Sequence, residues 1–439
     1  MHELCLLHPM IQSTLKLYTL RNIDSLRQFQ QLDPEAKEAL RVVAHILPFR
    51  VNNYVVENLI DWNNIPNDPI YQLTFMQKGM LDDSHYDQMK RFLSDPSVSK
   101  GDLAAIIYKI RKELNPHPAG QLSSNVPTFE DRPVPGVQHK YKQTALVFPS
   151  AGQQCHSYCT FCFRWPQFIG ESDLKFATDS QMTYLKYLRE HEELTDVLFT
   201  GGDPMVMNAK LLEKHLAPLL TPDYNHIQNI RIGSKSLSYW PQRFVSDKDS
   251  NEVLDLFKRI NDSGKQLAFM AHINHINELQ TDIVQEAIYK IRQTGTQIRT
   301  QAPLLRHIND DSAMWANMWK LQVRLGMVPY YFFIERDTGP KNYFSLPLAK
   351  TWEIYKNALQ EVSGLARTVR GPSMSASPGK VAIEGMNVIN GEKVFVLTLL
   401  QARNPNHIKK PFLAKFDENA IWFDQLVPAF GESKFFFEK

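Results

Sequence analysis

The sequence predicts an α/β fold: a partial barrel of parallel strands at residues 126–345, preceded by a helical N-terminal arm at 1–125 and followed by an α/β extension at 346–439. Three changes of pattern predict this division. Apolar residues recur every three or four positions in the arm, short β-branched runs alternate with amphipathic stretches in the core, and alternating apolar runs appear in the extension. A chain of 439 residues exceeds what one compact core usually holds, so we expect one large domain with appended segments.

In the arm, helical spacing is clearest at 36–46 and 103–114. The second of these helices should end at Asn115-Pro116-His117-Pro118-Ala119-Gly120, because two prolines and a glycine do not continue a helix. A loop rich in proline and glycine then leads to the core.

In the core, six strands should alternate with helices. We expect the strands at 145–148, 196–200, 230–233, 267–272, 298–301 and 328–334. We expect the helices at 180–193, 251–263, 281–294 and 312–325. Repeated strand-helix units favour parallel strands closed or partly closed into a (β/α)6-type barrel, whose chemistry sits at the carboxyl ends of the strands.

The extension begins with a helix at 348–361. A loop rich in glycine, serine and proline should continue through Lys380. The alternating run at 393–400 and an aromatic tail predict hairpin strands that pack on the barrel mouth.

Charge and apolar content exclude several classes of partner. The 49 Lys and Arg nearly balance the 47 Asp and Glu, giving a net charge of +2, and no block of one sign suggests nucleic acid or an anionic membrane. No run of about 18 apolar residues predicts a membrane span. We therefore expect a cytoplasmic protein, in a reducing compartment.

Three of the four cysteines lie within eight residues, in Cys155-His-Ser-Tyr-Cys159-Thr-Phe-Cys162, directly after the first predicted strand. Three thiolates without a fourth nearby suit a 4Fe-4S cluster with one open iron, whereas closed clusters and structural zinc sites take four ligands. Two other interpretations stay open: a zinc site completed by His156 or a distant histidine, and three unrelated buried thiols.

The C-x3-C-x2-C spacing resembles the radical SAM superfamily, in which S-adenosylmethionine (SAM) binds the open iron. That resemblance implies a radical SAM barrel. Gly201, Gly202 and Asp203 follow the second strand, where the superfamily has a glycine motif that holds the SAM amino group. Glycines there would let backbone approach a ligand closely, although Gly-Gly-Asp is also a common turn.

Further motifs resemble lysine 2,3-aminomutase-like proteins in their order and spacing, from about residue 100 to 385. They are Asn115 to Gly120, Pro133-Val-Pro-Gly136, Arg231-Ile-Gly-Ser234, Pro241-Gln-Arg243, His272-Ile-Asn-His275-Ile-Asn-Glu278, Gln301, Leu304-Leu-Arg306, Asn309-Asp310 and Pro329-Tyr-Tyr331. This resemblance implies transfer of an amino group from Cα to Cβ of an amino acid with the help of pyridoxal phosphate, whose π-system delocalises the substrate radical. It also implies an external electron donor of the flavodoxin or ferredoxin type, and we expect a homo-oligomer.

The resemblance assigns Lys380 as the catalytic lysine that holds pyridoxal phosphate, because the family has a Gly-rich loop ending in lysine at this point. The loop here is longer and serine-rich, and a solvated loop lysine is the alternative. Arg164 matches an arginine that faces cofactor and substrate, with a surface arginine as the alternative. Ser234, His272, Asn274 and Gln301 would contact SAM or the cofactor, or else be polar residues of the core.

At two positions the sequence differs from the lysine-specific members of the family, and both positions bear on the identity of the substrate. Lysine-specific members bind the substrate's amino groups with two aspartates, and Arg336 and Arg370 stand at those positions in an ungapped alignment. Arginine repels an ammonium and attracts a carboxylate or an amide oxygen, so we expect a substrate other than free lysine. Glu335 or Asp337 could take the aspartate role if the register shifts by one residue.

Two other enzyme functions stay open. Without a cofactor on Lys380, the barrel would be a pyridoxal-phosphate-independent radical SAM enzyme, such as an epimerase or dehydrogenase. The run 365–367 resembles relatives that modify a lysine of a partner protein, while the long arm and tail do not.

Overall fold

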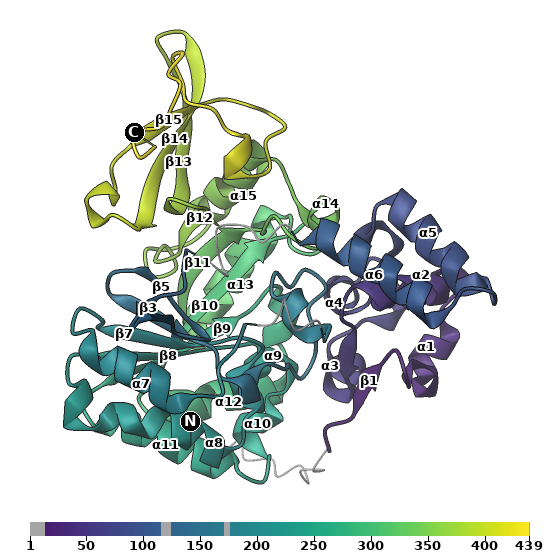
Figure 1. The fold of residues 1–439 in the computed structure, drawn as a ribbon, viewed down its shortest axis with the longest axis horizontal. Helices are drawn as coiled ribbons and strands as arrows, with labels where there is room; N and C mark the ends of the chain where they lie inside the picture. Colours follow the sequence, from purple (N-terminus) through teal and green to yellow (C-terminus); the bar gives the residue numbers. More distant parts are fainter. Residues whose placement is uncertain (1–13, 116–123, 171–175, 439) are drawn as a thin grey trace.

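The computed structural model describes residues 14–115, 124–170 and 176–438, and its centre is an eleven-stranded sheet (Figure 1). The strand order is β15-β14-β13-β12-β11-β10-β9-β8-β7-β6-β5. Strands β6 to β12 run parallel, and the others are antiparallel to their neighbours. The strands are β5 (Val137–Tyr141), β6 (Thr144–Val147), β7 (Asp196–Phe199), β8 (Asn229–Ser234), β9 (Gln266–His272), β10 (Gln297–Leu304), β11 (Val328–Ile334), β12 (Arg370–Ser375), β13 (Gly379–Ile389), β14 (Glu392–Ala402) and β15 (Phe412–Lys415).

Helices alternate with the parallel strands, as a barrel of this type requires. The longer ones are α7 (Gln181–Glu190), α8 (Ala209–Leu216), α11 (Ser250–Asp262), α12 (Asp282–Gln293), α13 (Ser312–Arg324) and α15 (Leu348–Gln360), with short helices α9 (Ser236–Tyr239), α10 (Gln242–Val245) and α14 (Lys341–Phe344). In α11 the buried residues Val253, Leu256, Phe257 and Ile260 recur at three- and four-residue spacing. Strand β9 is buried along almost its whole length, as expected for a sheet covered on both faces. The predicted partial α/β barrel is confirmed.

The hydrogen-bonded sheet does not close, because β5 and β15 are its two ends. Strand β14 nevertheless approaches β5 across the open side. Arg403, just after β14, donates 2.6 Å to Asn125 Oδ1 and 3.0 Å to the Ser377 carbonyl. The extension thus covers the gap that the partial barrel leaves.

The N-terminal arm lies to one side of the barrel (Figure 1). It contains β1 (Leu17–Thr19), β2 (Arg50–Asn52), α1 (Arg27–Gln31), α2 (Pro34–Ile46), α3 (Asn53–Asn58), α4 (Pro69–Thr74), α5 (Asp83–Ser94) and α6 (Lys100–Leu114). Helix α2 starts at Pro34 with Asp33 as its cap, whose carboxylate accepts 2.7 Å from the Ala36 amide. Helix α6 ends at Leu114 with Asn115 as its C-cap, which confirms the predicted end of this helix, and residues 116–120 of the predicted stop lie outside the described residues.

The predicted loop through Lys380 is wrong. Residues 370–375 form β12, a seventh parallel strand beside β11, and Lys380 is the second residue of β13. Glycine and serine lower strand propensity, but β12 gains main-chain hydrogen bonds from both neighbours. Only residues 376–378 connect the two strands.

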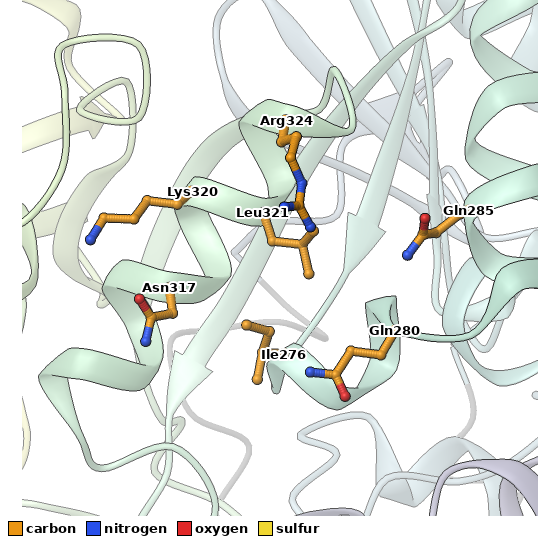
Figure 2. Close-up of a pocket in the computed structure, with 7 residues that line it drawn as sticks. All are labelled: Ile276, Gln280, Gln285, Asn317, Lys320, Leu321 and Arg324. Carbon is orange, nitrogen blue, oxygen red and sulfur yellow. The ribbon is translucent and has the colours of Figure 1, made fainter. Parts of the chain in front are cut away.

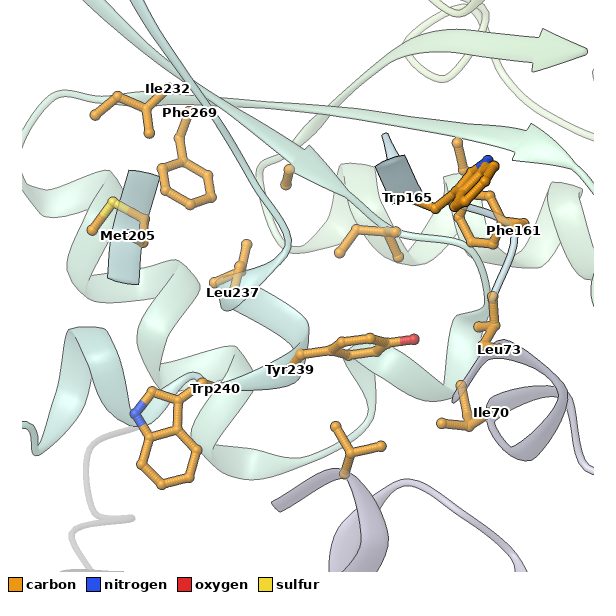
Figure 3. Packing of buried hydrophobic residues seen from close by; sticks show 14 of the residues in the cluster. Ile70, Leu73, Phe161, Trp165, Met205, Ile232, Leu237, Tyr239, Trp240 and Phe269 are labelled. Carbon is orange, nitrogen blue, oxygen red and sulfur yellow. The ribbon is translucent and has the colours of Figure 1, made fainter. Parts of the chain in front are cut away.

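One buried apolar cluster joins the arm to the barrel. Ile70 and Leu73 of α4 belong to the same cluster as Phe161 and Trp165 of the cysteine segment (Figure 3). A second cluster holds the extension together, with Phe412, Phe423 and Phe435 among its members.

Among the described helices, none has the length and apolar character that crossing a membrane demands. A short hairpin of β3 (Thr128–Phe129) and β4 (Arg132–Pro133) precedes β5.

Candidate active site

The cysteine segment follows β6 at the carboxyl edge of the sheet, and the arm holds it in place. The backbone amides of Tyr158 and Thr160 donate 2.9 Å to the carbonyls of Arg50 and Leu73. The Arg50 guanidinium donates 3.2 Å to the Cys155 carbonyl and lies over the Tyr158 ring. Sequence patterns alone gave no sign of this support, because it joins residues about a hundred positions apart.

Cys155, Cys159 and Cys162 are free thiols. Burial raises the pKa of all three, to about 12 for Cys159 and about 11 for Cys162, so metal binding must displace their protons. In the described part of the chain, the only grouping of three His, Cys, Asp or Glu ligand atoms within 4.8 Å of one another contains no cysteine. The three sulfur atoms therefore do not all lie within 4.8 Å of one another in this structure.

His156, the residue considered as a fourth ligand, is already engaged. Its Nδ1 lies 3.0 Å from Ser236 Oγ, and its ring stacks on Trp240. The zinc-type grouping that does occur contains His139, His191 and Glu193, outside the cavity described below. Within residues 14–115, 124–170 and 176–438, no grouping of ligand atoms completes a zinc site on the cysteines.

Gly201 and Gly202 follow β7 and pack against the residues that precede Cys155. A Cβ on Gly201 would lie 2.0 Å from the Gln153 side-chain nitrogen, and one on Gly202 would lie 2.5 Å from the Gln154 backbone nitrogen. A side chain at either position would therefore collide with the cysteine segment. These glycines therefore set the position of that segment.

Asp203 connects the ends of two neighbouring strands. Its carboxylate accepts hydrogen bonds of 2.9–3.0 Å from the hydroxyls and amides of the turn after β8 and from the Met205 amide; the donors are Ser234 Oγ, Ser236 Oγ and the amides of Lys235, Ser236 and Met205. With its oxygens satisfied by protein groups, Asp203 has a positioning role. Ser234, which was also predicted to contact a cofactor, donates its hydroxyl hydrogen bond to this carboxylate.

The ends of β9 and β10 carry the other predicted polar contacts. His272 Nδ1 lies 3.1 Å from Asn274 Oδ1, and the imidazole stacks on Phe161. Burial lowers the pKa of His272 to about 3, so the ring is neutral. Asn274 Nδ2 is buried and finds no hydrogen-bond partner among the described residues. An unpaired buried amide at a strand end is a group that a polar ligand would satisfy.

A buried ion pair supports this edge. Lys235 Nζ lies 2.5 Å from Glu278 Oε2 and donates 3.1 Å to the His272 carbonyl. The other Glu278 oxygen accepts from the Asn274 and His275 amides. The Lys235 ammonium lies 4.2 Å from the centre of the Tyr239 ring. Lys235, Glu278 and Tyr239 are all neighbours of Cys159.

A cavity of about 330 Å³ lies inside the barrel, lined by residues of the strands and of the cysteine segment. It brings together five of the predicted site residues, namely Arg164, His272, Gln301, Arg336 and Lys380. Sequence analysis missed several others that line it: Lys140, Tyr141, Asp196, Arg231, Tyr331, Phe333, Ser373 and Gln401. The alternation of residues along β5 could have pointed to Lys140, but β5 falls in a stretch that was predicted to be a loop.

Lys380 is not a solvated loop lysine. Its Nζ lies 3.8 Å from the centre of the Tyr331 ring and 5.0 Å from that of Phe333. Burial and the neighbouring charges of Arg231, Arg370 and Lys140 lower its pKa well below the usual value. The amine is therefore poised as a neutral nucleophile.

The three predicted substrate arginines differ in their surroundings. Arg164 lies over the rings of Phe148 and Phe163. Arg336 lies over Phe163 and Trp422, with Nε 3.5 Å from Asp337. Arg370 lies against Tyr330 and Tyr331 and is absent from the cavity lining.

A separate hollow of about 360 Å³ lies on the helical layer (Figure 2). It is lined by Ile276, Gln280, Gln285, Asn317, Lys320, Leu321 and Arg324. Its open, mostly amide and cationic lining contains no acid, base or nucleophile arranged for chemistry, so the barrel cavity is the candidate active site.

Comparison with known proteins decides the family. No family model matches the chain. A protein of Aquifex aeolicus that is provisionally named L-lysine 2,3-aminomutase is 32% identical over 417 residues, which cover 94% of this chain and 97% of the relative. This chain belongs to the lysine 2,3-aminomutase family of radical SAM enzymes.

More distant relatives carry the same enzyme name. L-lysine 2,3-aminomutase of Bacillus subtilis is 24% identical over 85% of this chain and 68% of its own length. That of Acetoanaerobium sticklandii is 25% identical over 79% of this chain and 71% of its own length. Among solved structures, a radical SAM methyltransferase from Sphaerobacter thermophilus superposes with a TM-score of 0.37 and 15% identity, covering 53% of this chain and 68% of that one.

Membership in this family makes the chain an aminomutase-like isomerase and implies a 4Fe-4S cluster with SAM. The residues fit those groups. Three free cysteines lie in one segment after β6, and the unpaired Asn274 amide follows β9. The fit of pyridoxal phosphate rests on the cavity alone.

Proposed function

We propose that this protein is a radical SAM, pyridoxal-phosphate-dependent 2,3-aminomutase that acts on a free amino acid other than lysine. One observation carries the proposal: the Lys380 amine, without a hydrogen-bond partner among the described residues, projects over Tyr331 into the cavity beside the cysteine segment. A buried lysine without an acidic partner is costly unless it stays neutral or forms a bond.

The cavity offers groups for two parts of pyridoxal phosphate, its aldehyde and its phosphate. Lys380 would bind its aldehyde carbon, and Lys140 would attract its phosphate. Lys140 donates 2.5 Å to the Ala376 carbonyl, and burial together with Arg403 and Arg336 lowers its pKa to about 7. When bound, the cofactor supplies a π-system that delocalises a radical beside the migrating nitrogen, and SAM on the cluster supplies the radical that removes the substrate hydrogen.

The cavity charge favours an acidic or neutral polar substrate. Its lining includes the cations Lys140, Arg164, Arg231 and Arg336. Of the lining carboxyls, Asp196 is paired with Arg231 at 2.6 Å, and burial raises the pKa of Glu335 well above the usual value. A free lysine side chain would add an ammonium to this positive site, whereas Arg164 is suited to a substrate carboxylate.

A small substrate also agrees with the covered side of the barrel. Arg403 and Lys140 tie the extension to β5 and to the segment before it, where a folded protein partner would have to enter. Trp422 of the extension reaches the Arg336 guanidinium at 5.7 Å. The extension thus supplies part of the wall around the cavity, which favours free amino acids over a lysine on a protein.

Anaerobic reconstitution with iron, sulfide, SAM and pyridoxal phosphate tests the proposal, with dithionite in place of the natural electron donor. Mass spectrometry of a mixture of the twenty amino acids should show a β-amino product and 5'-deoxyadenosine. Release of 5'-deoxyadenosine without any need for pyridoxal phosphate would support the epimerase or dehydrogenase alternative. Product formed only on a protein would support the protein-modifying alternative.

A further inference from the structure

Two successive residues in the cavity wall carry buried polar atoms that no protein group satisfies. Both carboxyl oxygens of Glu335 and both Nε and Nη2 of Arg336 lack a hydrogen-bond partner within the described chain. Glu335 is 5% exposed, and both residues line the barrel cavity just beyond the end of β11. Arg336 Nε is still close to a carboxylate, whereas Glu335 Oε1 and Oε2 and Arg336 Nη2 have no such neighbour, and buried polar groups are normally paired, so these three atoms in a cavity indicate a polar ligand.

The two side chains do not satisfy each other. They make no ion pair within 4.0 Å, whereas Arg336 Nε lies 3.5 Å from Asp337. Arg336 is held between the rings of Phe163 and Trp422. Both residues line the same cavity, where Arg336 offers a ligand only donors.

Glu335 offers both a donor and an acceptor. Burial raises its pKa well above the usual range, although Arg306 and Lys341 act in the opposite direction. A protonated carboxyl has one O–H donor and one carbonyl acceptor. Its natural complement has an acceptor and an N–H donor side by side.

The three possible ends of a substrate side chain differ in how well they match this pair. An ammonium satisfies Glu335 and is repelled by Arg336. A carboxylate accepts hydrogen bonds from Arg336, but it has no N–H to donate to the Glu335 carbonyl oxygen and places one of its own oxygens next to it. A primary amide accepts from Arg336 and from the Glu335 hydroxyl, and donates to the Glu335 carbonyl, so that every unpaired atom type finds a partner.

We propose that Glu335 and Arg336 together recognise a primary carboxamide, so that the substrate is an amino acid with an amide side chain, glutamine or asparagine. This inference rests on the proposed aminomutase function and adds its substrate class. Glu335 determines specificity between amide and acid, and Arg336 supplies affinity for the amide oxygen.

Binding without turnover tests the inference. The enzyme is reconstituted with cluster, SAM and pyridoxal phosphate but without reductant, and glutamine, asparagine, glutamate, aspartate and lysine are titrated by calorimetry. The better-fitting amide should bind about tenfold more tightly than its acid counterpart and than lysine, because losing one buried hydrogen-bond partner costs at least that factor.

Variants separate recognition from packing. Glu335→Leu should remove the preference for the amide, whereas Glu335→Gln, which still donates and accepts, should keep it within about threefold. Glu353→Leu, at an exposed residue of α15 with 54% side-chain exposure, is the matched control and should leave binding unchanged. Arg336→Met should weaken amide and acid alike.

Tighter binding of glutamate, aspartate or lysine would overturn the inference, as would an amide preference that survives Glu335→Leu. Tighter binding of glutamate or aspartate, or a preference that survives Glu335→Leu, would leave the proposed aminomutase function standing, whereas tighter binding of lysine would also contradict its exclusion of lysine. The aminomutase function fails separately if no amino acid yields a β-amino product in the reduced enzyme.

Discussion

The Lys380 amine lies 3.8 Å from the centre of the Tyr331 ring, although the two residues are almost fifty positions apart in the chain. Strand β12 makes this contact possible, because it pairs with β11 through Tyr331 on one side and with β13 through Lys380 on the other. The amine thus lies against an aromatic ring in the cavity and is not paired with a carboxylate among the described residues. This contact is the basis for assigning the cofactor to Lys380.

Lys140 should make binding of a phosphate group depend on pH. Its pKa is lowered to about 7, so above that pH an anion can bind the cation only with uptake of a proton. Affinity for pyridoxine 5'-phosphate, which has no aldehyde to react with Lys380, should fall as pH rises from 7 to 9, by up to about tenfold per unit. Fluorescence titration at each pH measures it.

The corresponding variant is Lys140→Met, which should bind weakly with a flat pH profile. The exposed Lys350→Met serves as its control, since its side chain is 57% exposed. An unchanged pH dependence in Lys140→Met would show that another group controls phosphate binding.

Asp203→Asn should destabilise the fold around the cysteine segment. The N–H groups of the new amide would point at some of the donors that now hydrogen-bond to the carboxylate. We therefore expect the free energy of unfolding to fall by about 3 kcal/mol. The variant should also retain less iron after reconstitution. Urea denaturation and iron analysis measure the two effects. The exposed Asp262→Asn should change stability by no more than about 0.5 kcal/mol. Full stability in Asp203→Asn would refute the positioning role.

Gly202→Ala should hinder cluster assembly. The added methyl would collide with the Gln154 backbone at 2.5 Å, and the shift would be passed to Cys155, the next residue. Gly364→Ala is the control, because a Cβ there meets no atom within 4 Å. Reconstituted iron content should fall several-fold only in the first variant. Equal iron in both would mean that the cysteine segment does not depend on this contact.

Sequence periodicity could predict the barrel because its helices and strands are strongly amphipathic or apolar. The helix expected at 281–294 is α12, Asp282–Gln293, and the strand expected at 267–272 is β9, Gln266–His272. Strand β12 was missed, since its stability comes from pairing with β11 and β13 rather than from its glycine and serine residues.

The site was only partly accessible from sequence. Motif spacing located the cysteines and Lys380, but not the contacts that give them their environment. Arg50, Asn125 and Trp422 come from segments remote from any motif and reach the site through tertiary packing. Arg370 shows the converse: an alignment position pointed to substrate, and the structure packs it against Tyr330 and Tyr331.

Reduction with borohydride tests the central claim most directly. The protein is incubated with pyridoxal phosphate, reduced, digested and analysed by mass spectrometry, with Lys380→Ala treated in parallel. We predict a stable phosphopyridoxyl group on the peptide that contains Lys380, and none in the variant. Labelling of another lysine, such as Lys140, or no labelling at all, would contradict the assignment.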